Sequence, residues 1–352
     1  MMRKLAGSLG GCVAALMLAA GHARAATPWF ERDACRDVLE SVNANRFDEA
    51  ENALGVLENR SDPDDRACAV YGRLFLAENY LSIHGDEPKW LANRDRHLKR
   101  MLIFAKTHAK FGARFADFEM EARMRRTRLL FDSGQQTEAV SEARRTNRLL
   151  KERLEDDDES ATRSFVQGVM YTAFGQSNFL ARTLFRLAGL GGSGDDGRAS
   201  LIDLADGDTP YMGEALYLTL HFAMEDAREG KTESPFGDPA ERARRLVERY
   251  PTNPQYVYEY VKVLQFQNRC AEAEAVLRSS LQAMNEDPRI WAPEMRAKLY
   301  YRAAECAIET QDVARATQYR DQLKAQARAN FNDELADLDT QLASVVKPSA
   351  DG

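Results

Sequence analysis

The chain has 352 residues, 44% of them hydrophobic, and a formal net charge of −7 at pH 7. An acidic chain repels the phosphate backbone, so we expect no binding to nucleic acid. The length is enough to bury a large core, as one or two domains or as an extended array.

Residues 1–25 have the pattern of a secretory signal peptide. Arg3 and Lys4 precede an uncharged apolar run from Leu5 to Ala20, and Ala23-Arg24-Ala25 follows as a small-x-small cleavage site. Cleavage after Ala25 removes three basic residues and no acid, so the mature chain carries −10. We therefore expect an exported protein, which in a bacterium means the periplasm. An uncleaved N-terminal anchor is the alternative.

Leu9-Gly-Gly-Cys12 resembles the cleavage box of a bacterial lipoprotein. The box lies ahead of most of the apolar run, however, so cleavage there would leave an apolar stub on the mature chain. Lipidation of Cys12 is therefore not expected.

The rest of the chain reads as a series of helices. Ala, Leu, Glu, Arg and Gln dominate, and Gly, Pro, Asn and Asp clusters interrupt the apolar periodicity at intervals of about 12–20 residues. We expect an all-α protein with three helical parts and a disordered tail. The helical parts are hairpins in 26–155, central helices with a Gly-rich loop in 156–236, and further repeats in 237–346. The tail is 347–352.

The hairpins share a small residue at one position. Ala50, Ala139, Ala273 and Ala316 each follow a turn, and each is followed by apolar residues at helical spacing. Alanine at this position allows two helices to cross closely.

These stretches resemble tetratricopeptide repeats, which are pairs of antiparallel helices of about 34 residues. The resemblance is best over 240–325, and no unit carries the full consensus set of residues. It implies a right-handed solenoid of helix hairpins whose groove binds another protein. Residues 160–250 are also similar to the middle of tetratricopeptide proteins of the inclusion-body-clearance type, a likeness that implies no chemistry.

Four cysteines remain after the signal peptide, one pair near each end. The separations are 33 residues for Cys35 and Cys68 and 36 residues for Cys270 and Cys306, close to one repeat. In an oxidising compartment we expect each pair to form a disulfide between neighbouring repeats. The alternative is four small buried thiols.

The stretch GLGGSGDDG at 189–197 matches the G-x-G-x-x-G dinucleotide fingerprint. Such a fingerprint follows a strand, whereas the residues before it read as the end of a helix. Asp195 and Asp196 would repel a phosphate. We therefore interpret the stretch as a turn, with Gly189 as a helix C-cap and one of the two aspartates as the next N-cap.

Charge is unevenly distributed. Residues 94–153 hold 16 Lys and Arg against 8 Asp and Glu. Arg123, Arg126 and Arg145 are candidates for a basic face that binds an anionic partner. A solvated surface with local ion pairs is the alternative.

Aromatic residues gather in the C-terminal repeats. Tyr256 and Tyr260 are candidates for a partner-binding groove, and core packing is the alternative for about half of this cluster. His221 is a further candidate for partner binding: it lies on an apolar helix face, as a core or groove histidine, with no neighbouring base or nucleophile in the sequence.

The sequence therefore favours a non-catalytic periplasmic adaptor that binds a protein or peptide and needs no cofactor or metal. A binder of anionic lipid or glycan through 94–153 is the first alternative. A helical enzyme whose carboxylates converge only in three dimensions is the second.

Overall fold

The structure is a computed structural model that describes residues 29–85, 87–108, 112–155, 160–176, 189–286, 291–326 and 331–346. The described residues form one short 3-10 helix, η1 (Trp29–Glu31), and fifteen α-helices, and they contain no strand. The all-α prediction is therefore confirmed. The signal peptide 1–25, Cys12 and the tail 347–352 lie outside the described residues.

The α-helices are, in chain order, α2 (Asp33–Asn43), α3 (Phe47–Glu58), α4 (Pro63–His84), α5 (Pro88–His108), α6 (Ala113–Asp132), α7 (Gln136–Leu154), α8 (Ala161–Gln176), α10 (Gly194–Asp206), α11 (Met212–Arg228), α12 (Pro239–Arg249), α13 (Pro254–Phe266), α14 (Cys270–Glu286), α15 (Pro293–Glu309), α16 (Val313–Gln326) and α17 (Asn332–Val346).

Local sequence explains where several helices begin. Proline is the first residue of α4, α12 and α13, a position that needs no hydrogen bond from the backbone nitrogen. The residue before each proline is Asp62, Asp238 or Asn253, and its side-chain oxygen accepts a hydrogen bond from a backbone N–H in the first turn. The predicted breakers thus separate the helices.

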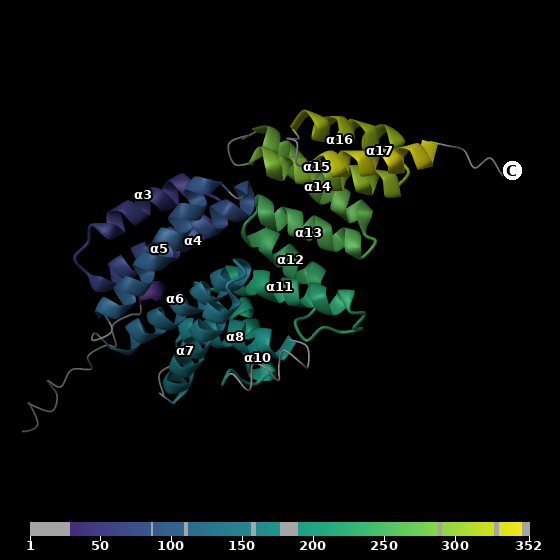
Figure 1. Ribbon diagram of the computed structural model, residues 1–352. Helices are drawn as coiled ribbons and strands as arrows, with labels where there is room; N and C mark the ends of the chain where they lie inside the picture. The colour runs from purple at the N-terminus through teal and green to yellow at the C-terminus, as the bar shows by residue number, and fades with distance from the viewer. Residues whose placement is uncertain are drawn as a thin grey trace, which may run out of the picture.

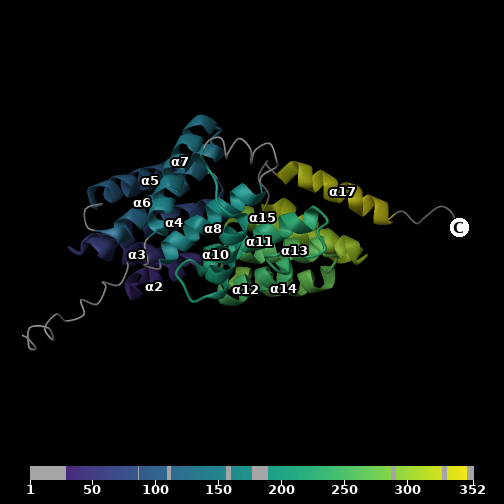
Figure 2. The same cartoon turned by 90° about the horizontal axis from the view of Figure 1, so that it is seen from below.

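Each described α-helix packs against the next one along the chain. The alanines of the shared hairpin position are 0% exposed, as a close helix crossing requires: Ala50, Ala139, Ala273 and Ala316. In the C-terminal half, α13 also contacts α15, and α15 contacts α17. Figure 2 shows α11, α13 and α15 on one side of this half and α12 and α14 on the other.

The N-terminal helices touch helices far along the chain. Helix α4 contacts α13 and α15, and lies beside them in Figure 1. At the end of α2, the backbone oxygen of Asn43 accepts a hydrogen bond from the Asn253 amide (2.8 Å), and its side-chain oxygen accepts one from the Tyr256 hydroxyl (3.0 Å). The chain therefore turns back on itself, and one apolar cluster extends from Trp29 to Leu338 through all three predicted helical segments.

The glycine stretch packs closely against α8. A Cβ on Gly197 would lie 2.6 Å from the backbone nitrogen of Thr172, and Gly194 packs directly against Gly175. Gly189 has a φ of +73°, as a C-cap requires, although the helix expected before it lies outside the described residues. The predicted N-cap is corrected: Ser193 caps α10, because its hydroxyl accepts the Asp196 N–H, and both aspartates lie in the first turn.

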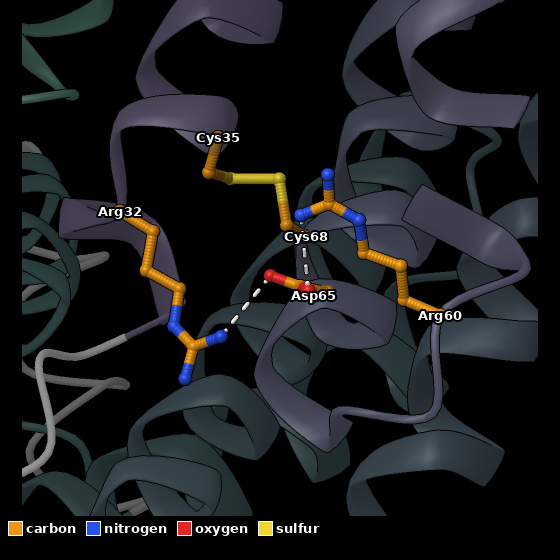
Figure 3. Close-up of a disulfide and its surroundings, with 5 residues drawn as sticks. All are labelled: Arg32, Cys35, Arg60, Asp65 and Cys68. Atoms are coloured by element: carbon orange, nitrogen blue, oxygen red, sulfur yellow. Dashed lines mark hydrogen bonds and ion pairs between the residues drawn. A yellow bond between two sulfur atoms is a disulfide. The ribbon is translucent and has the colours of Figure 1, made fainter. Parts of the chain in front are cut away.

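One predicted disulfide is present. Cys35 of α2 and Cys68 of α4 are bonded, with their Cα atoms 5.7 Å apart. Figure 3 shows the bond beside Asp65, which accepts hydrogen bonds from Arg32 (3.1 Å) and Arg60 (3.3 Å). Helix α2 is thus held against α4 by a covalent bond and by ion pairs around it.

The second predicted disulfide is wrong in this structure. Cys270 and Cys306 are buried free thiols. The Cys270 thiol donates a hydrogen bond to Glu309 (3.0 Å), and Cys306 sulfur accepts one from Gln265 (3.3 Å). Burial raises the pKa of both thiols, so the thiolate that disulfide exchange requires is disfavoured.

We expect the double variant C35A/C68A to lose about 3–4 kcal/mol of unfolding free energy, because the bond closes a loop of about 34 residues in the unfolded chain. Urea unfolding with and without reductant measures this loss. Reductant should destabilise the wild type and leave the double variant unchanged. Equal stability of the oxidised and reduced wild type would contradict the expectation.

Candidate functional site

A strip of polar and aromatic side chains follows alternate helices of the C-terminal half. Positions 255, 258, 259 and 262 share one face of α13 by helical spacing, as do 217 and 221 on α11. We call the following set the inner strip: Tyr217, His221, Gln255, Tyr258, Glu259, Lys262, Gln265, Arg302 and Glu305.

Contacts between neighbouring helices hold the inner strip in place. The Arg302 guanidinium of α15 lies 5.7 Å from the ring centroid of Tyr258 on α13, and the Lys262 ammonium lies 5.4 Å from the same ring. Lys262 also pairs with Glu259 (2.8 Å). The Tyr258 ring therefore lies within cation–π distance of two basic groups, of which Arg302 links α13 to α15.

Three polar atoms along the inner strip are buried without a hydrogen-bond partner among the described residues. They are Nε2 of His221, Oε1 of Gln265 and Nε of Arg302, on α11, α13 and α15 in turn. A buried polar atom left without a partner costs about 1–3 kcal/mol. Buried polar atoms without a partner are few in folded proteins, and each calls for an explanation, such as a bound water or a ligand.

A cavity adjoins two of these residues. It has a volume of about 280 Å³ and lies between α13, α15 and α17, lined by Gln265, Arg302, Ile308 and Gln341 among others. The inner strip thus has hydrogen-bonding groups and, beside them, space for a side chain of a bound ligand.

The structure separates the three C-terminal candidates. His221 belongs to the inner strip, in edge contact with Tyr217 (ring centroids 4.4 Å apart), and burial lowers its pKa, so the ring is neutral near pH 7. Tyr256 is a core residue, 5% exposed and bonded to Asn43, which corrects the prediction that it contacts a partner. Tyr260 is half-buried and close to the charges of Arg244 and Arg269, beside α12 and α14.

The three candidate arginines do come together. Arg123, Arg126 and Arg145 all approach one carboxylate, that of Glu142 on α7, at 2.5, 4.0 and 3.5 Å. Arg123 also pairs with Glu119. The excess positive charge expected from the sequence is therefore partly neutralised within α6 and α7.

A buried charge network lies between α4, α6 and α11, and no local pattern of residues predicts it. The Arg125 guanidinium donates to Glu78 (2.6 Å), Glu121 (3.0 Å) and Glu214 (2.8 Å). The Tyr211 hydroxyl donates to Glu121 (2.5 Å). Arg125 is one of four nearby arginines on α6, and only its contacts with α4 and α11 distinguish it.

Glu121 is the most enclosed member of this network, with 0% exposure. Burial raises its pKa to about 7, because the attraction of Arg125 only partly offsets the loss of water and the repulsion of Glu214. Its hydrogen bonds to Tyr211 and Arg125 make it a structural acid within the core.

Comparison of the chain with protein-family models and with curated proteins gives no match. The described residues also contain no helix that is both long and apolar enough to cross a membrane.

We expect the unfolding free energy of the wild type to fall, relative to E121Q, as pH rises from about 4.5 to 7. The folded chain holds the Glu121 proton up to about pH 7, whereas the unfolded chain releases it near the ordinary value of 4.5. The difference approaches about 1.4 kcal/mol per pH unit within this window.

Urea unfolding at half-unit steps from pH 4.5 to 8 measures the difference. The matched control is E119Q, on the same helix and partly exposed, which should keep the wild-type slope. Parallel curves for wild type and E121Q would show that Glu121 does not titrate in this range.

Proposed function

We propose that this protein is a non-catalytic scaffold of the tetratricopeptide type, a right-handed solenoid that holds an extended segment of another protein along the inner strip. The observation that carries the proposal is the row of unpartnered buried atoms on His221, Gln265 and Arg302.

An extended peptide is the ligand whose chemistry best matches this row. Its backbone offers carbonyl acceptors and N–H donors, which suit the Arg302 Nε–H donor and the Gln265 Oε1 acceptor respectively. Tyr217 and Tyr258 are half-buried on the same face and provide contact area at low entropic cost.

Export to the periplasm is part of the proposal. It rests on the signal-peptide pattern of residues 1–25 and on the Cys35–Cys68 disulfide, which is typical of an oxidising compartment.

A second candidate function is binding to an anionic lipid or glycan of the envelope. Arg126 and Arg145 have side chains 44% and 56% exposed, and they share the carboxylate of Glu142 with Arg123. Three arginine charges meet only the two carboxylates of Glu142 and Glu119, so part of the positive charge is available at the surface. Such binding would weaken steeply with salt.

The test of the scaffold function is affinity capture from a native envelope extract with the tagged mature chain, at low and high salt. We expect one protein to be retained by the wild type through high salt and to be lost by R302A and by H221A. Loss of a desolvated hydrogen bond weakens binding several-fold at the neutral His221, and about tenfold or more at the charged Arg302.

The matched control is R244A, which removes an exposed arginine of α12 that pairs with Glu241 and Glu248. Retention by the control and loss by both strip variants would support the inner strip. Retention by all variants would contradict it, and recovery of only lipid or glycan, lost at high salt, would favour the second candidate.

A further inference from the structure

A second cavity lies between α3, α4 and α5, on helices that contribute nothing to the inner strip. Its volume is about 240 Å³, below the roughly 300–1,000 Å³ of sites for drug-sized ligands. Charged and polar side chains of α3, α4 and α5 line it, together with Trp90. A ligand that fits here is small and mostly polar.

His97 is the unpartnered group of this cavity. Its side chain is 8% exposed and lines the cavity, and neither ring nitrogen has a hydrogen bond to a described residue. Burial and, to a smaller extent, the charges of Arg96 and Arg100 together lower its pKa to about 4. The ring is therefore neutral near pH 7 and carries one N–H donor and one acceptor.

The charges around His97 leave one positive group unbalanced. Arg73 pairs with Glu51 (3.2 Å) and Glu58 (3.3 Å), and Arg100 pairs with Glu58 (3.4 Å). Arg96 has no carboxylate partner among the described residues, and its guanidinium donates only to the amide oxygen of Asn93 (2.8 Å). Three guanidinium groups thus face two carboxylates, which favours a ligand with one anionic group.

Trp90 adds an aromatic surface to the lining. One side of its ring stacks on Tyr80, with centroids 4.1 Å apart, and Tyr80 in turn stacks on His84. The stack fixes the ring, and Trp90 is partly exposed where it lines the cavity. A rigid aromatic ring beside hydrogen-bonding groups suits a molecule with both C–H faces and hydroxyl groups.

We propose that this cavity binds a monosaccharide-sized ligand that bears one carboxylate or phosphate group. Arg96 takes the anionic group in a forked pair of hydrogen bonds. His97, Asn93 and Glu58 supply donors and acceptors for hydroxyl groups, and Trp90 covers the C–H face of the ring.

The experiment is calorimetric titration of the mature protein with four probes: glucuronate, glucose 6-phosphate, glucose and inorganic phosphate. We expect saturable binding of one or both charged sugars, and binding at least about tenfold weaker for glucose. The two charged sugars distinguish a carboxylate from a phosphate ligand.

Trp fluorescence gives an independent readout. Trp29 and Trp291 are 0% and 3% exposed, so a ligand-dependent change reports mainly on Trp90. The change should disappear in W90F.

The variant R96A should weaken binding about tenfold or more, whereas K99A, an exposed position on the same helix, should leave it unchanged. Thermal melts of each variant establish that it folds. H97Q keeps a donor and an acceptor and should retain more affinity than H97F.

If neither charged sugar binds, or if R96A binds them as tightly as the wild type does, the proposal is overturned. Binding of inorganic phosphate as tight as that of the sugars would also overturn it, since it would reduce the cavity to an anion site. None of these outcomes bears on the inner strip, so the proposed scaffold function is tested separately.

Discussion

The buried guanidinium of Arg125 fixes how the two halves of this chain meet. It binds carboxylates from α4, α6 and α11, and the Tyr211 hydroxyl links Glu121 to Thr162 of α8 at 3.0 Å. Removing one partner of a buried ion pair lowers the free energy of unfolding by about 3–5 kcal/mol, because the other charge is left buried without a partner. Helices α4, α6 and α11 therefore cannot slide past one another independently.

This constraint decides which faces of the later helices are available. With α11 held against α4 and α6, the end of α2 docks on the turn between α12 and α13 through Asn43 and Asn253. That docking covers the Tyr256 side of α13 and leaves the Tyr258 side for the inner strip. Figures 1 and 2 show the resulting arrangement, with α4 beside α13 and α15, and α11, α13 and α15 in one layer.

Features that depend on neighbouring residues could be predicted from the sequence. The Asp62-Pro63 and Asn253-Pro254 helix starts and the buried alanines follow from capping and from close helix crossing. The Cys35–Cys68 disulfide followed from repeat spacing. The same spacing brought Cys270 and Cys306 into contact, but the two remain buried free thiols that also hydrogen-bond to Glu309 and Gln265.

Features that depend on distant contacts could not be predicted. Tyr256, Tyr258 and Tyr260 lie within one turn and a half of α13, yet one is core, one belongs to the inner strip and one lies beside α12. Arg125 and Arg126 are adjacent, and one is buried while the other is exposed. The partners that bury Arg125 and Tyr256 include Glu78 and Asn43, which are 47 and 213 positions away, where no local pattern reaches.

The most direct measurement of the scaffold function is photo-crosslinking in cells that express the protein, with benzoylphenylalanine placed at Tyr258 or at Tyr260. Both positions hold a tyrosine on α13 and they face opposite layers, so each serves as the control for the other. If the inner strip holds a partner, position 258 yields one defined crosslinked protein and position 260 yields none. Crosslinking from 260 alone, or equally from both positions, would contradict a partner bound along the inner strip.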